Sequence, residues 1–366
     1  MNSKKMAPWL GLLLGIVISC SLSALFSESP WHVFKILSTS FFNSKFDFGL
    51  TLFYTTCLIF SGLAFAIPMK AGLFHIGSEG QILLAALVAA YMGSAHFSGA
   101  TTLPAGLAFL LLVAVTLFSG MLAALVLAFF KLVKHAHEVV VAIMLNFIFA
   151  ALTTWLTVNY LQNPDSQNPE TALIVPSLRF LENDFLKLYF EKSAVSSFLI
   201  VAVFSCVVLY VFEKKTLLGY QIRAFGINSA AAGRIGISSR KTLIMTLGLA
   251  GVFSAFVGLT EVLGNTFQYK IGFSPQYGFL GIAVALLARQ HFVGIIGSAF
   301  LMACLHKGAS DLDLETNFLT RDFSNVLQAI IIFSVAASYF LFSNNNKISR
   351  RRARHQPKKV PKEQVL

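Results

Sequence analysis

Apolar runs that are long enough, or nearly long enough, to cross a bilayer recur from one end of the chain to the other. Hydrophobic residues make up 56% of the 366 residues and charged residues only 12%, and no soluble globular domain has this composition. In hydrocarbon, a backbone without internal hydrogen bonds is too costly, so the runs must be helical. The sequence therefore predicts an all-α polytopic membrane protein.

Lysines and arginines gather in two places, and this bias predicts the orientation of the runs. Residues 213–241 carry six of them against one glutamate, and residues 344–366 carry eight against one, a net charge of +7. Both segments are therefore expected in the cytoplasm. We predict about ten transmembrane segments, some of them short or broken, with both termini cytoplasmic and the largest external loop at residues 162–192.

This pattern divides the chain into three parts. An N-terminal segment with the first transmembrane helix covers residues 1–44, the main transmembrane domain covers residues 45–342, and a basic cytoplasmic tail covers residues 343–366. The tail is typical of an anchor beside anionic membrane lipid, and not of a nucleic-acid-binding arm. We expect no nucleic-acid partner.

The first apolar run ends in a sequence that resembles a lipoprotein cleavage site, Val17-Ile18-Ser19-Cys20. A removable signal peptide is therefore one interpretation. The other is a retained helix, which gives the following segments the cytoplasmic start that their charges require. The four cysteines all lie in apolar runs without CxxC spacing, so neither a disulfide framework nor a metal site is predicted.

Residues 71–81, with the sequence AGLFHIGSEGQ, precede the short apolar run 82–90. Ser78 and Gln81 have the spacing of a capping box, which predicts a helix that begins at Ser78. That helix would be roughly 20 Å long against about 30 Å of hydrocarbon. Residues 71–78 must then either enter the membrane without helical bonding, buried in protein, or lie at its surface.

Polar side chains within this apolar surrounding are candidates for a substrate pathway. They are His75, Ser78, Glu79, Gln81 and, in the middle of the predicted helix 138–161, Asn146. Each also has a purely structural interpretation. Glu79 and Gln81 can serve as helix caps, His75 as a packed residue, and Asn146 as an interhelical hydrogen-bonding group.

A weak internal repeat has a separation of 200 residues. Lys70, Gly72, Ile82, Ala85 and Leu87 recur as Lys270, Gly272, Ile282, Ala285 and Leu287. In the predicted topology the two copies are inverted, and inverted repeats with broken helices are typical of transporters, whose substrate path lies at the breaks. Chance matches in a chain rich in glycine, alanine and leucine are the alternative explanation.

The chain contains no phosphate-binding loop of the G-x-x-x-x-G-K-[ST] type. Intramembrane ionisable candidates are few, namely His75, Glu79 and Glu261, which is little for ion coupling. The cytoplasmic loop 216–239 is apolar and rich in alanine, and residues 229–235 have the pattern of a short helix between glycines. Such a helix outside the membrane indicates a protein partner.

Taken together, residues 71–81, 140–146, 216–237 and 277–289 resemble the permease subunits of ABC importers. The resemblance is to the branched-chain amino acid, ribose and nucleoside group, and within it to the nucleoside type. It extends over about residues 45–342. His75 and Ser78 depart from the group's Gly-Leu-Phe-Asn-Ile-Gly-Ala-Glu-Gly-Gln signature, and they therefore bear on ligand choice.

The resemblance implies a transport subunit that is not itself an enzyme and has no cofactor of its own. A separate ATPase would bind ATP and magnesium, with a second permease subunit and an extracytoplasmic substrate-binding lipoprotein as further partners in a bacterial cytoplasmic membrane. The expected solute is a nucleoside, with a sugar or another small heterocycle as the alternative. Two other classes remain open: a gradient-driven secondary transporter and a passive channel.

The ATPase would dock on the loop that resembles the family's coupling loop. Small residues permit a close approach, and Arg223 offers a guanidinium fork for an ATPase carboxylate, or serves only as a topology charge. The residues assigned to this loop are Gly219, Arg223, Gly226, Asn228, Ala231, Ala232 and Gly236.

Overall fold

The computed structural model describes residues 3–26, 28–134, 136–316 and 326–338. Within these ranges the ordered elements are helices, and the only extended pairing is three isolated bridges. The prediction of an all-α fold is confirmed. Five helices are long and apolar enough to cross a membrane: Trp9–Phe26, Lys45–Lys70, Ala105–Lys134, Glu138–Leu161 and Ser239–Thr266.

A helix is present in each of the ten predicted apolar runs. These helices are α1 (Ser3–Leu22), α3 (Lys45–Lys70), α4 (Ser78–Gly93), α6 (Ala105–Lys134), α7 (Glu138–Leu156), α9 (Phe198–Lys215), α12 (Ser239–Glu261), α13 (Tyr277–Leu287), α14 (Gly294–Glu315) and the helix Val326–Ser338. Shorter helices connect them: α2 (Pro30–Thr39), α5 (Ser98–Thr102), α8 (Phe185–Tyr189), α10 (Leu217–Ile227) and α11 (Ser229–Arg234). The predicted basic tail, residues 343–366, lies outside the described residues.

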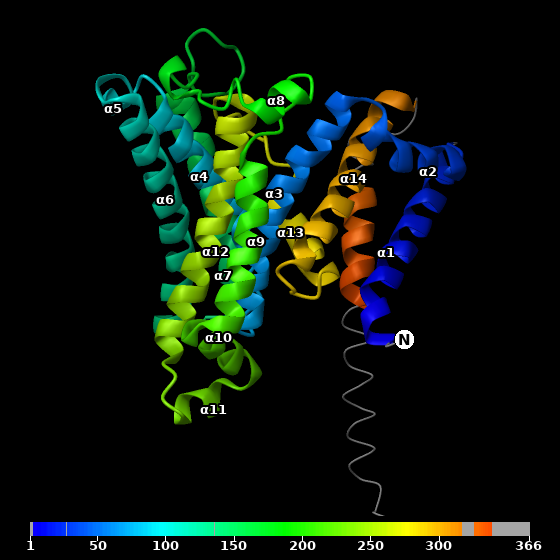
Figure 1. The fold of residues 1–366 in the computed structure, drawn as a ribbon, viewed down its shortest axis with the longest axis vertical. Coiled ribbons are helices and arrows are strands. Elements are labelled where there is room, and N and C mark those ends of the chain that lie inside the picture. The colour runs from blue at the N-terminus through cyan, green and yellow to red at the C-terminus, as the bar shows by residue number, and fades with distance from the viewer. Residues whose placement is uncertain (1–2, 27, 135, 317–325, 339–366) are drawn as a thin grey trace, which may run out of the picture.

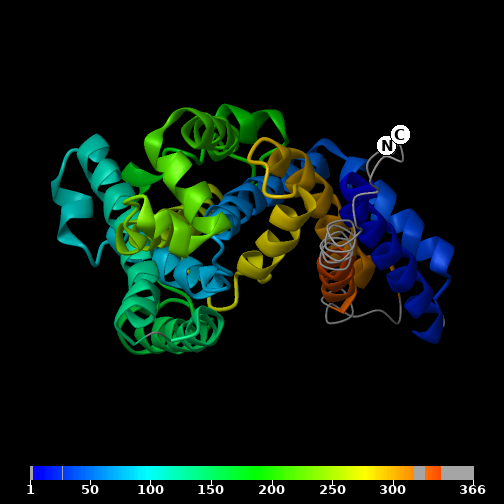
Figure 2. The same cartoon turned by 90° about the horizontal axis from the view of Figure 1, so that it is seen from below.

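The long helices run side by side between two ends of the molecule (Figure 1). One end carries α5 and α8, and the opposite end carries α10 and α11. Seen from below, α13 lies between a larger group around α6, α7, α9 and α12 and a smaller group around α1, α2 and α14 (Figure 2). Helix α3 packs against α12, α13 and α14. Of the five helices that are long and apolar enough to cross a membrane, it is the one most covered by the rest of the protein.

Helices α3 and α14 extend beyond the apolar runs that they contain. Helix α3 begins at Lys45, five residues before the apolar run, because the Ser44 side chain caps it and accepts a hydrogen bond from the Asp47 amide at 3.0 Å. The apolar run of α14 ends at His306, but the helix continues through Lys307 to Glu315. The Lys307 ammonium is buried there between Asp47 at 3.0 Å and Asp311 at 2.7 Å, so these carboxylates neutralise it.

Helix α1 is packed onto the last described helix through small residues spaced four apart. A Cβ at Gly11 would overlap the Ser338 side chain, and one at Gly15 would lie 2.9 Å from the Ile331 Cα. One turn further, Ser19 donates to the Leu327 carbonyl at 3.4 Å. This small-xxx-small contact is a common way for transmembrane helices to associate, and it makes α1 an integral part of the bundle.

Candidate functional site

The segment between α3 and α4 is non-helical and enclosed by protein. His75 is 1% exposed, and Ala71 and Leu73 are also buried. Helix α4 has 16 residues and is therefore roughly 24 Å long, shorter than about 30 Å of hydrocarbon. Most of residues 71–78 are covered by neighbouring helices, which is the condition that irregular backbone must meet at membrane depth.

The predicted capping box is wrong. Gly77 is the N-cap residue of α4, and no side chain caps the helix at that position. The Ser78 hydroxyl is buried without a hydrogen-bond partner. The Gln81 side chain is turned back onto the imidazole of His75, whose Nε2 lies 3.3 Å from its amide nitrogen. Gln81 is thereby engaged with the imidazole and not with the N-cap backbone, while the His75 Nδ1 is buried without a hydrogen-bond partner.

Asn146 of α7 takes over part of the capping. Its Oδ1 accepts a hydrogen bond from the Gly80 amide at 2.9 Å, and its Nδ2 donates to the Ile76 carbonyl at 3.0 Å. Gly80 permits this approach, since a Cβ there would lie 2.9 Å from the Asn146 Cα. Asn146 therefore fixes both the start of α4 and the end of the preceding non-helical segment, residues 71–77, to the same neighbouring helix.

Glu79 connects α4 to α13. Its Oε2 accepts a hydrogen bond from the Gly278 amide at 2.8 Å, and Gly278 lies in the first turn of α13. A Cβ on Gly278 would lie 2.5 Å from the Glu79 amide nitrogen. Because both helix N-termini carry partial positive charge, one carboxylate stabilises two helix starts at once.

Two non-helical segments, residues 71–77 before α4 and residues 267–276 before α13, enter the bundle from opposite ends. We call them the broken leads. Lys70, at the end of α3, pairs with Glu213 of α9 at 2.7 Å, beside α10 at the lower end of Figure 1. Lys270 lies 3.7 Å from Glu170, in the segment that also carries α8 at the upper end. From these ends the leads run inward and meet at Glu79 and Gly278. This is the geometry that an inverted repeat requires.

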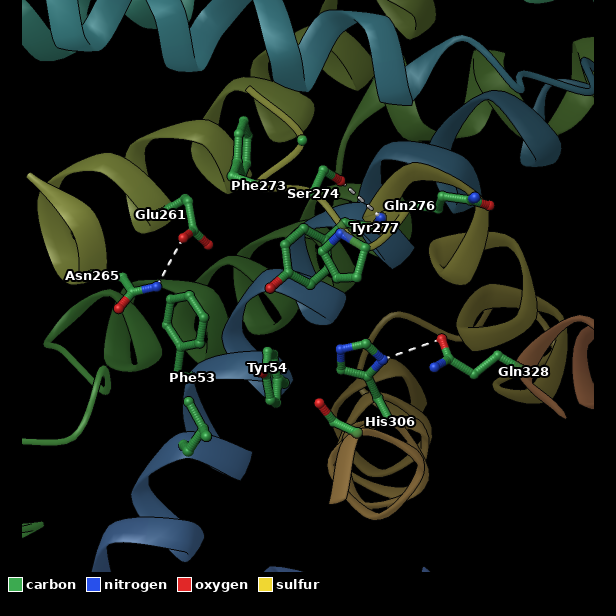
Figure 3. Close-up of a pocket in the computed structure, with 14 residues that line it drawn as sticks. Phe53, Tyr54, Glu261, Asn265, Phe273, Ser274, Gln276, Tyr277, His306 and Gln328 are labelled. Atoms are coloured by element: carbon green, nitrogen blue, oxygen red, sulfur yellow. Dashed lines mark hydrogen bonds between the residues drawn. The ribbon is translucent and has the colours of Figure 1, made fainter. Parts of the chain in front are cut away.

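A cavity of about 470 Å³ lies next to this junction (Figure 3). Its walls come from α3, the end of α12, the π-helical turn η5 (Val262–Thr266), the lead into α13, α14 and the helix Val326–Ser338. The five predicted pathway residues do not line it. They form the packed support of the junction on the α4 side, while the cavity opens on the α13 side.

Two polar pairs face the cavity, with aromatic rings between them (Figure 3). Asn265 donates to the Glu261 carboxylate at 2.8 Å. Elsewhere in the cavity wall, the His306 Nδ1 lies 3.1 Å from the Gln328 Oε1. Tyr277 lies between the two pairs. The π-helical turn places Asn265 beside Glu261, and such turns are frequent at functional sites.

The segment that carries α8 covers the η5 turn from above. The ammonium of Lys187 donates to the Gly264 carbonyl at 2.9 Å and lies 4.8 Å from the centre of the Phe267 ring. Burial lowers the pKa of Lys187, and nearby Glu182 and Asp184 oppose that shift. Gln268 also donates to Glu170 at 2.9 Å. The upper end of the segment that leads into α13 is thus held by residues 162–192.

Some of the cavity residues could not be recognised from the sequence. Glu261 was singled out as one of few ionisable residues in an apolar run, and the internal repeat indicated the break near Gly272. Asn265, His306 and Gln328 carried no comparable signal, because they come from three separate elements that meet only in the folded chain. Within the described ranges, no group of His, Cys, Asp or Glu suits a metal ion.

At the lower end, the predicted short helix is present as α11, and Asn228 caps it by accepting from the Ala231 amide at 3.0 Å. Ala231 is exposed, whereas Ala232 is buried. Gly236 has a φ of +86°, a conformation that favours glycine. These residues form the surface and the end of a well-defined helical loop.

Helix α10 packs tightly against the transmembrane bundle. A Cβ at Gly219 would overlap the Phe212 carbonyl, and one at Gly226 would overlap the Lys70 carbonyl. Arg223 is turned inward, where its Nη1 donates to the Glu213 backbone carbonyl. Its guanidinium therefore has a partner within its own chain, while 34% of its side chain stays exposed.

A helical bundle in which two broken helices meet beside a polar cavity is the architecture of a membrane transport permease. A family model agrees: the one described as "Branched-chain amino acid transport system / permease component" matches residues 47–336, so the chain belongs to this family. The chain is 31% identical to the guanosine ABC transporter permease protein NupP of Bacillus subtilis (strain 168), over 96% of this chain and 98% of that protein.

Two further relatives match a similar length of this chain. The nucleoside ABC transporter permease protein NupB of Lactococcus lactis subsp. cremoris (strain MG1363) is 28% identical, over 92% of each chain. The glucose ABC transporter permease protein TsgB13 of Haloferax volcanii is 27% identical, over 91% of this chain and 87% of that protein. These three permeases are thus named for solutes of two chemical classes, nucleosides and a sugar.

Proposed function

We propose that the chain is the permease of an ATP-driven importer and that it translocates nucleosides. The observation that carries the substrate class is the cavity beside α13, in which aromatic rings lie between two polar pairs. Its volume of about 470 Å³ falls within the usual range of small-molecule sites, about 300–1,000 Å³. The names of the Bacillus and Lactococcus relatives support the same class.

A nucleoside has two chemically different ends, and the cavity offers a counterpart to each. The base has a flat π face, which suits Phe53 and Tyr277, and an edge of donors and acceptors, which suits Glu261 and Asn265. The ribose carries hydroxyls that can bond the imidazole and amide of His306 and Gln328. In this proposal His75, Ser78, Gln81 and Asn146 act from behind the wall, where they hold the junction in shape.

The energy source would be a separate ATPase that holds ATP and magnesium. Its docking surface would be the outer face of α10 and α11, which lie at the lower end of the molecule in Figure 1. Leu217 is 71% exposed, Ile227 87% and Ile235 66%. Exposed apolar residues on a segment outside the membrane are typical of a protein interface.

The same proposal fixes the topology. All ten helices of the predicted runs would span or enter the bacterial cytoplasmic membrane, with both termini and residues 213–241 inside and residues 162–192 outside. A second permease subunit and an extracytoplasmic lipoprotein receptor would complete the importer. Labelling of the variant Ser166→Cys with an impermeant maleimide tests this topology. We expect reaction from the outside, and labelling from the inside alone would contradict it.

The substrate class is tested by competition. We expect that uptake of a radiolabelled nucleoside by the intact complex is reduced by excess unlabelled nucleosides and unaffected by glucose or leucine. Glucose is the specific rival, because the Haloferax relative is named for it. Competition by glucose and by no nucleoside would replace the proposed substrate with a sugar.

A further inference from the structure

Glu261 is a buried acidic residue in the cavity wall. It is 4% exposed, and its one side-chain hydrogen bond among the described residues comes from Asn265. Among the residues that the structure describes, no lysine, arginine or histidine nitrogen lies within 4.0 Å of its carboxylate. A buried acidic group is costly unless its oxygens receive hydrogen bonds.

The hydrogen-bonding capacity of Glu261 is only partly used. A carboxylate can accept about four hydrogen bonds, and Asn265 supplies one, to Oε1. In Figure 3 the second oxygen is directed away from Asn265. Since the Nδ2 of Asn265 already donates to Glu261, its Oδ1 is a second acceptor at the same end of the cavity. This end therefore presents acceptors and calls for a ligand with donors.

The surrounding rings define the shape of that ligand. Phe53 and Tyr277 lie beside the Glu261–Asn265 pair (Figure 3). A planar heterocycle can lie against these rings while its edge points at the carboxylate, and stacking of this kind is a common way to hold a base. The ligand that fits is flat and carries adjacent N–H groups along one edge.

We propose that Glu261 selects purine nucleosides whose base carries N1–H and a 2-amino group, as guanine does. Both groups are donors on one edge, so they can meet the carboxylate together. Hypoxanthine, which has N1–H alone, would rank second. Adenine presents its N1 as an acceptor and would place a lone pair against the carboxylate. This inference rests on the proposed nucleoside transport and assigns the base preference to one residue.

The variant Glu261→Gln tests the assignment. Glutamine keeps the size of the side chain but offers one acceptor and one donor, the pattern that pairs with adenine. The complete complex is reconstituted with its receptor and given guanosine and adenosine in one mixture, each with a different radiolabel. Because the receptor is the same for both proteins, a change in the uptake ratio originates in the permease.

We expect the guanosine-to-adenosine uptake ratio to fall at least ~5-fold in Glu261→Gln, which is the lower end of the usual discrimination by a paired base contact. The control is Glu182→Gln, an exposed acid in the external segment, which should leave the ratio unchanged. An unchanged ratio in Glu261→Gln overturns the inference. Failure of the wild-type complex to import any nucleoside overturns the proposed function instead.

A second measurement covers the case in which Glu261→Gln does not assemble. Wild-type permease–ATPase complex in proteoliposomes is treated with dicyclohexylcarbodiimide, and modification of Glu261 is followed by mass spectrometry. We expect guanosine at millimolar concentration to reduce the modification several-fold more than adenosine does. Equal protection by both nucleosides, or protection by neither, overturns the inference.

Discussion

The Glu79 carboxylate accepts a hydrogen bond from the Gly278 amide at 2.8 Å and joins two helix N-termini whose residues are 199 positions apart in the chain. Helices α4 and α13 point away from this contact toward opposite ends of the molecule (Figure 1). The cavity begins at the neighbouring Tyr277. A rearrangement of α4 against α13 would therefore change the cavity wall directly.

The contact between α4 and α13 requires a glycine at position 278. In Gly278→Ala the new methyl group would lie 2.5 Å from the Glu79 amide nitrogen and force the helices apart. We expect a loss of about 1–3 kcal/mol, the usual cost of overpacking, and a strong reduction of uptake. Thermal unfolding in detergent measures the first effect. The control is Gly297→Ala, where a Cβ meets no atom within 4 Å, and equal behaviour of both variants would contradict the prediction.

Asn146 should be important for stability, although it does not line the cavity. Asn146→Leu keeps most of the volume but leaves the Gly80 amide and the Ile76 carbonyl without their partner. We expect a destabilisation of about 2 kcal/mol. In the matched variant Asn159→Leu, the lost bond is an exposed one to Trp155 in the same helix, so the unfolding temperature should hardly change. A wild-type unfolding temperature for Asn146→Leu would refute this role.

The cluster of the buried Lys307 with the half-buried Asp47 and Asp311 should depend on its cation. Lys307→Met leaves two acidic groups next to each other without a counter-charge, and we expect a cost of about 3 kcal/mol or more. Adding Asp47→Asn and Asp311→Asn removes the repulsion, so the triple variant should regain much of the stability. A triple variant that unfolds below Lys307→Met would show that the charges are not the cause.

Docking of the ATPase is best tested at Ala231, because this side chain is exposed on α11. We expect Ala231→Trp to weaken ATPase retention in a pulldown at least ~5-fold, as bulk at a packed interface costs about 1–3 kcal/mol. The control is Ala24→Trp, also exposed but in the connection near α2 at the opposite end. Normal retention and uptake in Ala231→Trp would remove α11 from the mechanism.

Arg223 is a less direct test of docking than Ala231. From the sequence, its guanidinium was expected either to pair with an ATPase carboxylate or to serve only as a topology charge, and in the structure its Nη1 donates to the Glu213 backbone carbonyl, next to the ion pair of Glu213 with Lys70. Substitution of Arg223 by glutamate would put a second acid beside Glu213 and disturb the junction of α9 and α10. Loss of transport in that variant would not distinguish docking from folding.

The helices could be predicted because membrane insertion leaves few alternatives. Apolar length and the positions of Lys131, Lys214 and Arg240 were sufficient to place the runs and loops. The helix ends were harder to predict where a residue far away in the chain neutralises a charge. Lys307 is an example, because its partner Asp47 is 260 positions earlier. Local rules treat such a lysine as the end of a membrane helix.

The broken leads could also be predicted, but the roles of their side chains could not. Ser78 and Gln81 have the spacing of a capping box, yet His75 is closer to the Gln81 amide and Asn146 caps from another helix. Competition between a local and a distant hydrogen-bond partner is decided only by packing. The same limit applies to His306 and Gln328, which became cavity residues when their helices came together.

The account as a whole is tested by nucleoside uptake into proteoliposomes that contain the complete complex, with ATP or a non-hydrolysable analogue enclosed. We predict that guanosine accumulates above its external concentration with ATP, that it does not with the analogue, and that the permease reconstituted alone imports none under a proton or sodium gradient. Concentrative uptake by the permease alone under an ion gradient, or simple equilibration without ATP, would contradict the central claim.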